Sequence, residues 1–172
     1  MIKNRWLALL VCLAILFVGC KKKEEVSYQG KPLSAWIEML RDKENPSQRS
    51  AAVKAIIEIG PAAKDAIPDL IEVIRETRNT NKPLLFACNK ALLGMGREIV
   101  PDMVALLKDD NWEMRRGAAW ILGKLGPEGK NAIPALTEAL NDTNADVRMK
   151  AKEALKKITS GDRQTISGEG TM

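Results

Sequence analysis

The sequence predicts an all-α protein, a right-handed α-solenoid of about four stacked helical hairpins. Three features predict it: a helix-compatible composition, a segment that recurs at regular intervals, and Gly-Pro turns between the copies. Hydrophobic residues make up 45% of the 172 residues and aromatic residues only 4%. Ala, Leu and Ile dominate the apolar set, which favours helices over a β-sandwich.

The first residues have the form of an export signal. Lys3 and Arg5 give a basic start, and an apolar run then extends from Trp6 to Val18. The run is about thirteen residues long, shorter than the ~20 residues that cross a bilayer as a helix. We therefore expect residues 1–19 to be a signal peptide.

The end of this run, Phe-Val-Gly-Cys at residues 17–20, resembles the lipobox of bacterial lipoproteins. The resemblance implies that Cys20 becomes the acylated first residue of the mature chain, followed by a tether over residues 20–27. Phe17 departs from the usual aliphatic residue, so an uncleaved signal anchor is the alternative. A lipid would hold the body at a membrane of the bacterial cell envelope, in the periplasm or outside the cell.

The rest of the chain repeats itself. Pro68, Pro101 and Pro134 each follow an aliphatic residue and are evenly spaced, and the same distance separates Arg115 from Arg148. Gly-Pro pairs at residues 60–61 and 126–127 end a helix and prevent its continuation. Each copy is therefore predicted to form a helix, a tight turn and a second helix. Stacked copies bury the apolar face that one hairpin cannot bury alone.

The limits of the repeat domain follow from the same pattern. A divergent first copy spans residues 31–56, so we place the domain at residues 28–159, with residues 28–36 docked as an N-terminal cap. Residues 160–172 are polar, contain glycine and lack periodicity, and we expect them to be disordered.

Two runs carry a resemblance to a family: Arg-Arg-Gly-Ala-Ala-Trp-Ile-Leu-Gly-Lys-Leu-Gly-Pro at residues 115–127 and Asp-Val-Arg-Met-Lys-Ala-Lys-Glu-Ala-Leu at residues 146–155. They resemble HEAT repeats of the PBS-lyase HEAT-like type, and the resemblance extends over about residues 28–158. It implies a structural role for the repeat arginines, which would pair near the turns with aspartates of their own or a neighbouring copy, with ligand binding as the alternative. The residues concerned are Arg49, Arg115, Arg148, Asp42, Asp109 and Asp142. The second copy departs from the pattern, with Leu85 where the arginine is expected.

A partner surface is expected on the exposed side of the second helices, which line the concave face of a solenoid. Aligned copies place aromatic, basic and apolar side chains in two adjacent rows there. Phe86, Arg116 and Trp120 are of types enriched at interface hot spots, although Trp120 would serve equally well as packing between repeats. The candidate partner-binding residues are Lys54, Phe86, Lys90, Arg116, Trp120 and Met149.

Composition argues against several functions. The chain has no histidine, the commonest metal ligand and neutral-pH base, so we expect no metal, no cofactor and no His-based catalysis. Without Lys3 and Arg5 the chain has 25 basic and 22 acidic residues, interspersed along every segment, which makes nucleic acid an unexpected partner. Cys88 lies in an apolar segment and is expected to be a buried core residue, with a nucleophile as the alternative.

Three functions remain. The leading hypothesis is a non-catalytic, membrane-tethered scaffold that binds a protein or peptide in the bacterial cell envelope. A chromophore lyase-type enzyme or lyase subunit is the second, taken from the name of the repeat type. The third is a structural subunit of an envelope complex.

Overall fold

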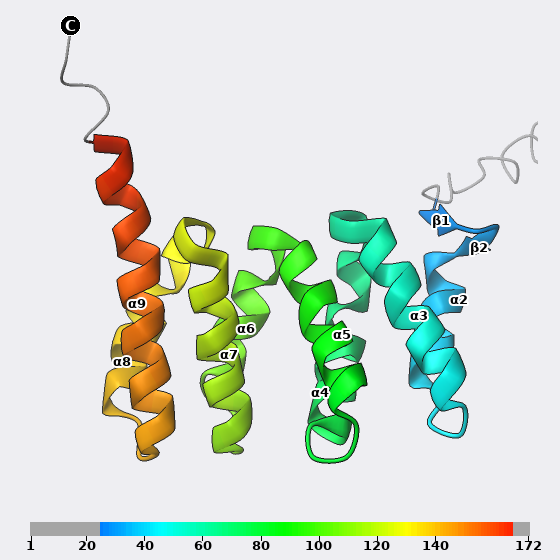
Figure 1. Cartoon of the computed structure of the whole chain (residues 1–172), viewed down its shortest axis with the longest axis horizontal. Coiled ribbons are helices and arrows are strands. Elements are labelled where there is room, and N and C mark those ends of the chain that lie inside the picture. The colour runs from blue at the N-terminus through cyan, green and yellow to red at the C-terminus, as the bar shows by residue number, and fades with distance from the viewer. Residues whose placement is uncertain (1–24, 167–172) are drawn as a thin grey trace, which may run out of the picture.

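The structure, a computed structural model, describes residues 25–166. Over this range the chain forms four helical hairpins stacked in a row (Figure 1), so the predicted all-α solenoid is confirmed. The predicted signal peptide, Cys20 and the first part of the tether lie outside the described residues. No helix within residues 25–166 is long and apolar enough to cross a membrane.

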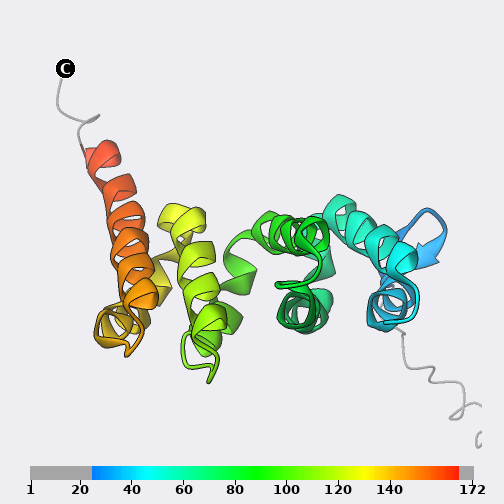
Figure 2. The ribbon, with the colours of Figure 1, turned by 60° about the horizontal axis from the view of Figure 1, so that its bottom comes forward.

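Each hairpin pairs a first helix with a second helix. The first helices are α2 (Leu33–Arg41), α4 (Ile67–Thr77), α6 (Val100–Leu106) and α8 (Ile133–Glu138). The second helices are α3 (Pro46–Ile59), α5 (Lys82–Gly94), α7 (Trp112–Leu125) and α9 (Ala145–Ile166). Figure 2 shows the two sets as two layers, with the second helices side by side in one of them.

Short 3-10 helices connect one hairpin to the next. They are η1 (Gly60–Ala66), η2 (Gly96–Ile99) and η3 (Gly126–Ala132), and η4 (Ala139–Asn141) lies inside the last hairpin. Gly60, Gly96 and Gly126 have positive φ angles of 67°, 62° and 58°. This left-handed backbone turns the chain sharply at the end of each second helix, and glycine adopts it without steric cost.

An asparagine begins each second helix. The side chain of Asn81 accepts a hydrogen bond from the backbone N–H of Leu84, and Asn111 accepts one from that of Glu113. Asn144 does the same for the N–H of Asp146 at 2.9 Å. These bonds satisfy N–H groups that have no partner inside the helix, which fixes where the helix starts.

The core is a continuous aliphatic layer between the two sets of helices. Its fully buried large side chains come from every hairpin and include Leu40, Ile56, Leu70, Leu92, Met103, Leu122, Leu136 and Ile158. Helices α7 and α9 approach closely at Gly123 of α7, where an added Cβ would lie 2.9 Å from the Cα of Ala154 in α9. Small residues at this crossing let α7 and α9 pack tightly.

The two ends of the described domain have different structures. Strands β1 (Ser27–Tyr28) and β2 (Lys31–Pro32) form a small hairpin, and the Trp36 indole N–H donates to the Tyr28 carbonyl at 3.3 Å. This hairpin occupies the position expected for the N-terminal cap. Helix α9 continues to Ile166, beyond the expected start of disorder at residue 160, because helix formation propagates from the packed turns before it.

Candidate partner-binding site

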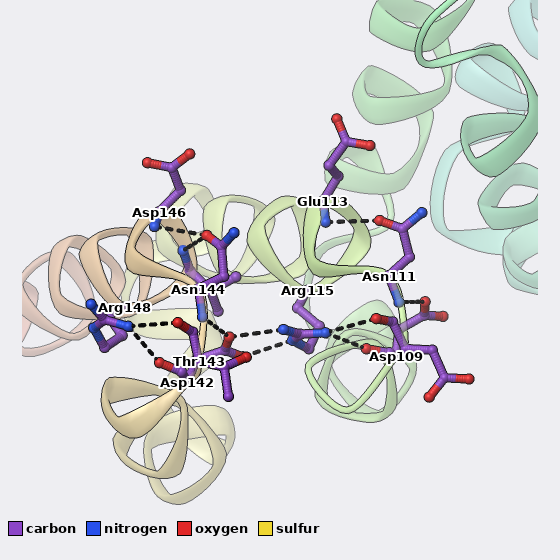
Figure 3. A network of polar contacts seen from close by, with 11 residues as sticks. Asp109, Asn111, Glu113, Arg115, Asp142, Thr143, Asn144, Asp146 and Arg148 are labelled. Atoms are coloured by element: carbon purple, nitrogen blue, oxygen red, sulfur yellow. Dashed lines mark hydrogen bonds and ion pairs between the residues drawn. The ribbon is translucent and has the colours of Figure 1, made fainter.

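Arginine–carboxylate pairs join each hairpin to the next. The guanidinium of Arg115 in α7 donates from Nε and Nη2 to the two carboxylate oxygens of Asp142, at 2.7 and 2.8 Å (Figure 3). Its Nη1 donates to the backbone carbonyls of Asp109 and Asp110. One side chain thereby closes its own hairpin turn and binds the following turn, a geometry that lysine cannot reproduce.

The carboxylates of these pairs are shifted toward the ionised form. Hydrogen bonds from Arg115 lower the pKa of Asp142, and those from Arg75 lower the pKa of Asp109. Each aspartate also accepts from a backbone N–H two residues later, that of Asn144 or of Asn111. Both aspartates are therefore structural acceptors at a turn.

Arg49 does not pair with any of the three aspartates expected as partners of the repeat arginines. Asp42 accepts from the backbone N–H of Glu44 and from the side chain of Asn45, so its oxygens serve its own turn. The buried Arg49 instead donates to the carbonyl of Leu40 at 2.9 Å and to the carboxylate of Glu76 at 2.7 Å. Glu76 belongs to the next hairpin, so Arg49 spans two hairpins in the same way as Arg115.

Arg148 has a different set of acceptors. Its Nη1 donates to the backbone carbonyls of Asp142 and Thr143, at 2.7 and 3.0 Å, and not to the Asp142 carboxylate. That carboxylate already receives both bonds from Arg115. No further hairpin follows within the described residues, so Arg148 closes only its own turn.

The second hairpin is built in a shifted register. The asparagine at the start of the second helix and the turn glycine are equally far apart in three hairpins: Asn45 to Gly60, Asn81 to Gly96, and Asn111 to Gly126. The segment from the repeat proline to the following asparagine, however, is three residues longer after Pro68 than after Pro101 or Pro134. Three residues are therefore inserted before α5, and the shorter η2 removes three after it.

The insertion explains why Leu85 occupies the arginine position. Leu85 follows its capping asparagine by four residues, as Arg115 follows Asn111, but its side chain carries no donor. The first helix supplies the missing links, since Arg75 binds both oxygens of Asp109 at 2.6 and 3.1 Å. Arg78, at the C-terminal end of α4, pairs with Glu113 in the first turn of α7.

A groove of about 390 Å³ opens at this junction, between α5 and α7. These two helices pack less closely than α7 and α9 do. The lining includes Leu92, Met103 and Met114 of the buried core, together with the extended end of α4. The groove therefore has an apolar floor that reaches the core of the solenoid.

Three of the six predicted partner-binding residues line this groove. Phe86, with 67% of its surface exposed, comes from α5, whereas Arg116 and the half-buried Trp120 come from α7. Lys54, Lys90 and Met149 lie on second helices and are exposed, but outside the groove. Trp120 thus both packs against the core and presents a surface to the groove.

The sequence reasoning missed the polar residues that surround the groove, which include Arg78, Lys82, Asn89 and Glu113. Two signals could have found them. The asparagine caps recur at regular distances from the turn glycines, and the proline-to-asparagine distance is longer in the second hairpin alone among the last three. Together these distances locate the inserted turn.

Cys88 is fully buried, and this burial raises the pKa of its thiol to about 12. A thiol with so little thiolate at neutral pH is a poor nucleophile. Within residues 25–166 no group of three or more cysteine, aspartate or glutamate side chains is arranged to hold a metal ion. The α5–α7 groove, by contrast, brings three of the predicted partner-binding residues together.

Comparison with known proteins agrees with the stacked hairpins. Residues 78–156 match the family model described as HEAT repeats. This region is similar to an array of HEAT repeats. It contains α5 of the shifted second hairpin, all of the third hairpin and the first half of α9, and so includes both walls of the groove.

Two further proteins are similar to the chain. The eIF-2-alpha kinase activator GCN1 of Dictyostelium discoideum is 30% identical over an alignment of 146 residues that covers 70% of this chain and 5% of that protein. This chain thus spans a small fraction of that relative's length. The crystal structure of an engineered protein covers 75% of this chain and 63% of its own, with a TM-score of 0.40 and 18% identity. The matches to HEAT repeats and to GCN1 support a HEAT-repeat protein.

Proposed function

We propose that this protein is a non-catalytic scaffold that binds a protein partner on its second-helix face, centred on the α5–α7 groove. The observation that carries the proposal is the meeting of Phe86, Arg116 and Trp120 around an apolar floor. Aromatic residues and arginine supply most of the binding energy at protein interfaces when they border a pocket that excludes water. HEAT repeats commonly mediate such contacts.

The side chain of Phe86 is mostly exposed, so it is available to a binding partner. Two-thirds of its surface is exposed, although the lining of the groove includes several buried apolar residues. Arg116 is exposed as well, and its guanidinium lies 5.9 Å from the centre of the Trp112 ring. Such stacking holds the side chain in a defined position at little entropic cost, which favours binding.

A crosslinking pull-down tests the scaffold function. Arg116→Ala combined with Trp120→Ala should abolish partner capture while leaving the helical circular dichroism unchanged. Because Trp120 also packs on the core, Phe86→Ala provides a second variant that removes mostly exposed surface, and it should reduce capture as well. The control, Lys64→Ala with Lys130→Ala, changes exposed residues of η1 and η3. Undiminished capture by both groove variants would contradict the proposal.

We further propose that the scaffold is tethered to a membrane of the bacterial cell envelope through acylated Cys20. The lipobox-like segment at residues 17–20 supports this. Cys20→Ala should abolish labelling by a clickable fatty acid, whereas Cys88→Ser should leave it intact because Cys88 is buried. Equal labelling of the Cys20→Ala variant and the parent would refute the lipid tether.

A further inference from the structure

The two helices that form the groove expose basic charge. Their exposed charged residues are Lys82 and Lys90 of α5, with Arg116 and Lys124 of α7. The outer second helices expose both signs of charge, since α3 exposes Glu58 beside Lys54, and α9 exposes Asp146 and Glu153 together with several lysines. Helices α5 and α7 thus differ in carrying exposed cations and no exposed carboxylate. A basic field at a groove attracts segments of the opposite sign.

The rim of the groove has the same charge. Lys82 and Arg116 border it and are exposed, and Arg78 lies at the end formed by α4. Among the described residues that line the groove, Glu113 is the one carboxylate, and Arg78 already pairs with it. The Nη1 atom of Arg78 is buried and has no hydrogen-bond partner among the described residues.

The floor requires an apolar group. Leu92, Met103 and Met114 are buried beneath the groove, and Phe86 and Trp120 stand on its two sides. Methionine side chains are flexible and adapt to apolar groups of different shape. An aliphatic or aromatic side chain inserted here would remove the exposed Phe86 from water.

We infer that the α5–α7 groove binds a partner-protein segment in which an apolar anchor residue is flanked by aspartate or glutamate. This inference rests on the proposed scaffold function and specifies the chemistry of its partner. The apolar residue fills the groove between Phe86 and Trp120. The flanking carboxylates meet the exposed Lys82 and Arg116.

A protein segment fits this surface better than a nucleic acid does. Phosphates would match the cations, but nucleotides carry no aliphatic side chain for the floor formed by Leu92, Met103 and Met114. A nucleic-acid groove has cations that follow the backbone continuously. Here Phe86 and Trp120 line the groove together with Lys82 and Arg116.

Selection from a random peptide library displayed on phage tests the inference with the folded chain. The parent protein should enrich sequences in which leucine, isoleucine, methionine or phenylalanine lies next to Asp or Glu. Synthetic copies of the enriched peptides should bind about tenfold more weakly when their acidic residues are replaced by Asn and Gln, a loss of ~1.4 kcal/mol. Their affinity should also fall as salt is raised.

Charge reversal gives the decisive comparison. Lys82→Glu with Arg116→Glu should change the enriched sequences from acidic to basic while apolar anchors persist, a result that an unfolded variant could not give. Lys64→Glu with Lys130→Glu adds the same charge on the connecting 3-10 helices and should leave the acidic preference unchanged.

Several results would overturn the inference. These are enrichment of basic or uncharged peptides by the parent, the same acidic preference in the charge-reversed variant, no enrichment at all, or displacement of the peptides by single-stranded RNA at lower concentration than by free peptide. A partner crosslinked in cells through a segment without acidic residues would also refute it. That last result would leave the scaffold function standing, so the two failures can be told apart.

Discussion

Arg115 and Asp142 lie 27 residues apart in the sequence and form a two-pronged ion pair between consecutive hairpins. Both side chains are largely buried, with 14% and 9% of their surface exposed. Arg49 and Glu76 repeat the relationship at an earlier junction, at the same separation of 27 residues. At these two junctions an arginine of the second helix therefore links one hairpin to the next.

Arg115→Ala should lower the free energy of unfolding by about 1.5–3 kcal/mol, because it leaves the Asp142 carboxylate and two turn carbonyls without their donor. Arg115→Lys should recover only part of this, since a lysine cannot reach both oxygens and the carbonyls together. Urea denaturation measures both. Arg148→Ala is the matched control. Arg148 occupies the same repeat position but has no carboxylate partner, so its replacement should lower the free energy of unfolding by less. An equal loss would contradict the role assigned to the Arg115–Asp142 pair.

Stability should fall in acid through the ion-paired aspartates. The pKa values of Asp109 and Asp142 are lowered in the folded state, so their contribution is complete above the unfolded pKa of about 3.9 and is lost as the pH falls through the folded values. Asp109→Asn with Asp142→Asn should therefore flatten the dependence of the unfolding free energy on pH below about 4. Parallel slopes for variant and parent would contradict this.

Two glycines of α7 should respond in opposite directions to alanine. At Gly123 the new Cβ would lie 2.9 Å from the Ala154 Cα, so Gly123→Ala should lose about 1–3 kcal/mol by forcing α7 and α9 apart. At Gly117 nothing lies within 4 Å of the new Cβ, and Gly117→Ala should gain about 0.5–1 kcal/mol of helix stability. Thermal unfolding of both variants provides the measurement. A neutral Gly123→Ala would show that the helices do not meet this closely.

Cys88 should resist thiol reagents in the folded protein. Its burial and its pKa of about 12 leave almost no accessible thiolate at neutral pH. Peptide mapping by mass spectrometry after maleimide treatment should find Cys88 modified slowly in buffer and rapidly in denaturant. Similar rates in both would contradict its place in the core.

The repeat pattern predicted the helical hairpins because caps, turns and apolar spacing all act locally. The positions of Arg115 and Asp142 followed from the same repeats. The partners of Arg49 could not be predicted in this way, because Asp42 is nearer in sequence but is satisfied by its own turn, which leaves Glu76 of the next hairpin as the acceptor.

The groove could not be predicted from the sequence for a different reason. The three residues inserted before α5 are offset by three removed in η2, so Pro68, Pro101 and Pro134 remain evenly spaced in the sequence. The sequence therefore predicted Phe86, Arg116 and Trp120 as surface residues without their common floor. The contribution of Arg78 to the groove was not predicted, because Arg78 follows the longer helix α4 and contacts α7 only in the folded chain.

A photo-crosslinking phenylalanine analogue at position 86 tests the central claim most directly, because it nearly preserves the side chain that lies at the groove. In intact cells it should form a specific protein adduct that disappears when Arg116→Ala and Trp120→Ala are added. The same analogue at Glu72, an exposed residue of α4 on the first-helix layer, should form no such adduct. Equal adducts at both positions, or none at position 86, would contradict a partner-binding site in the α5–α7 groove.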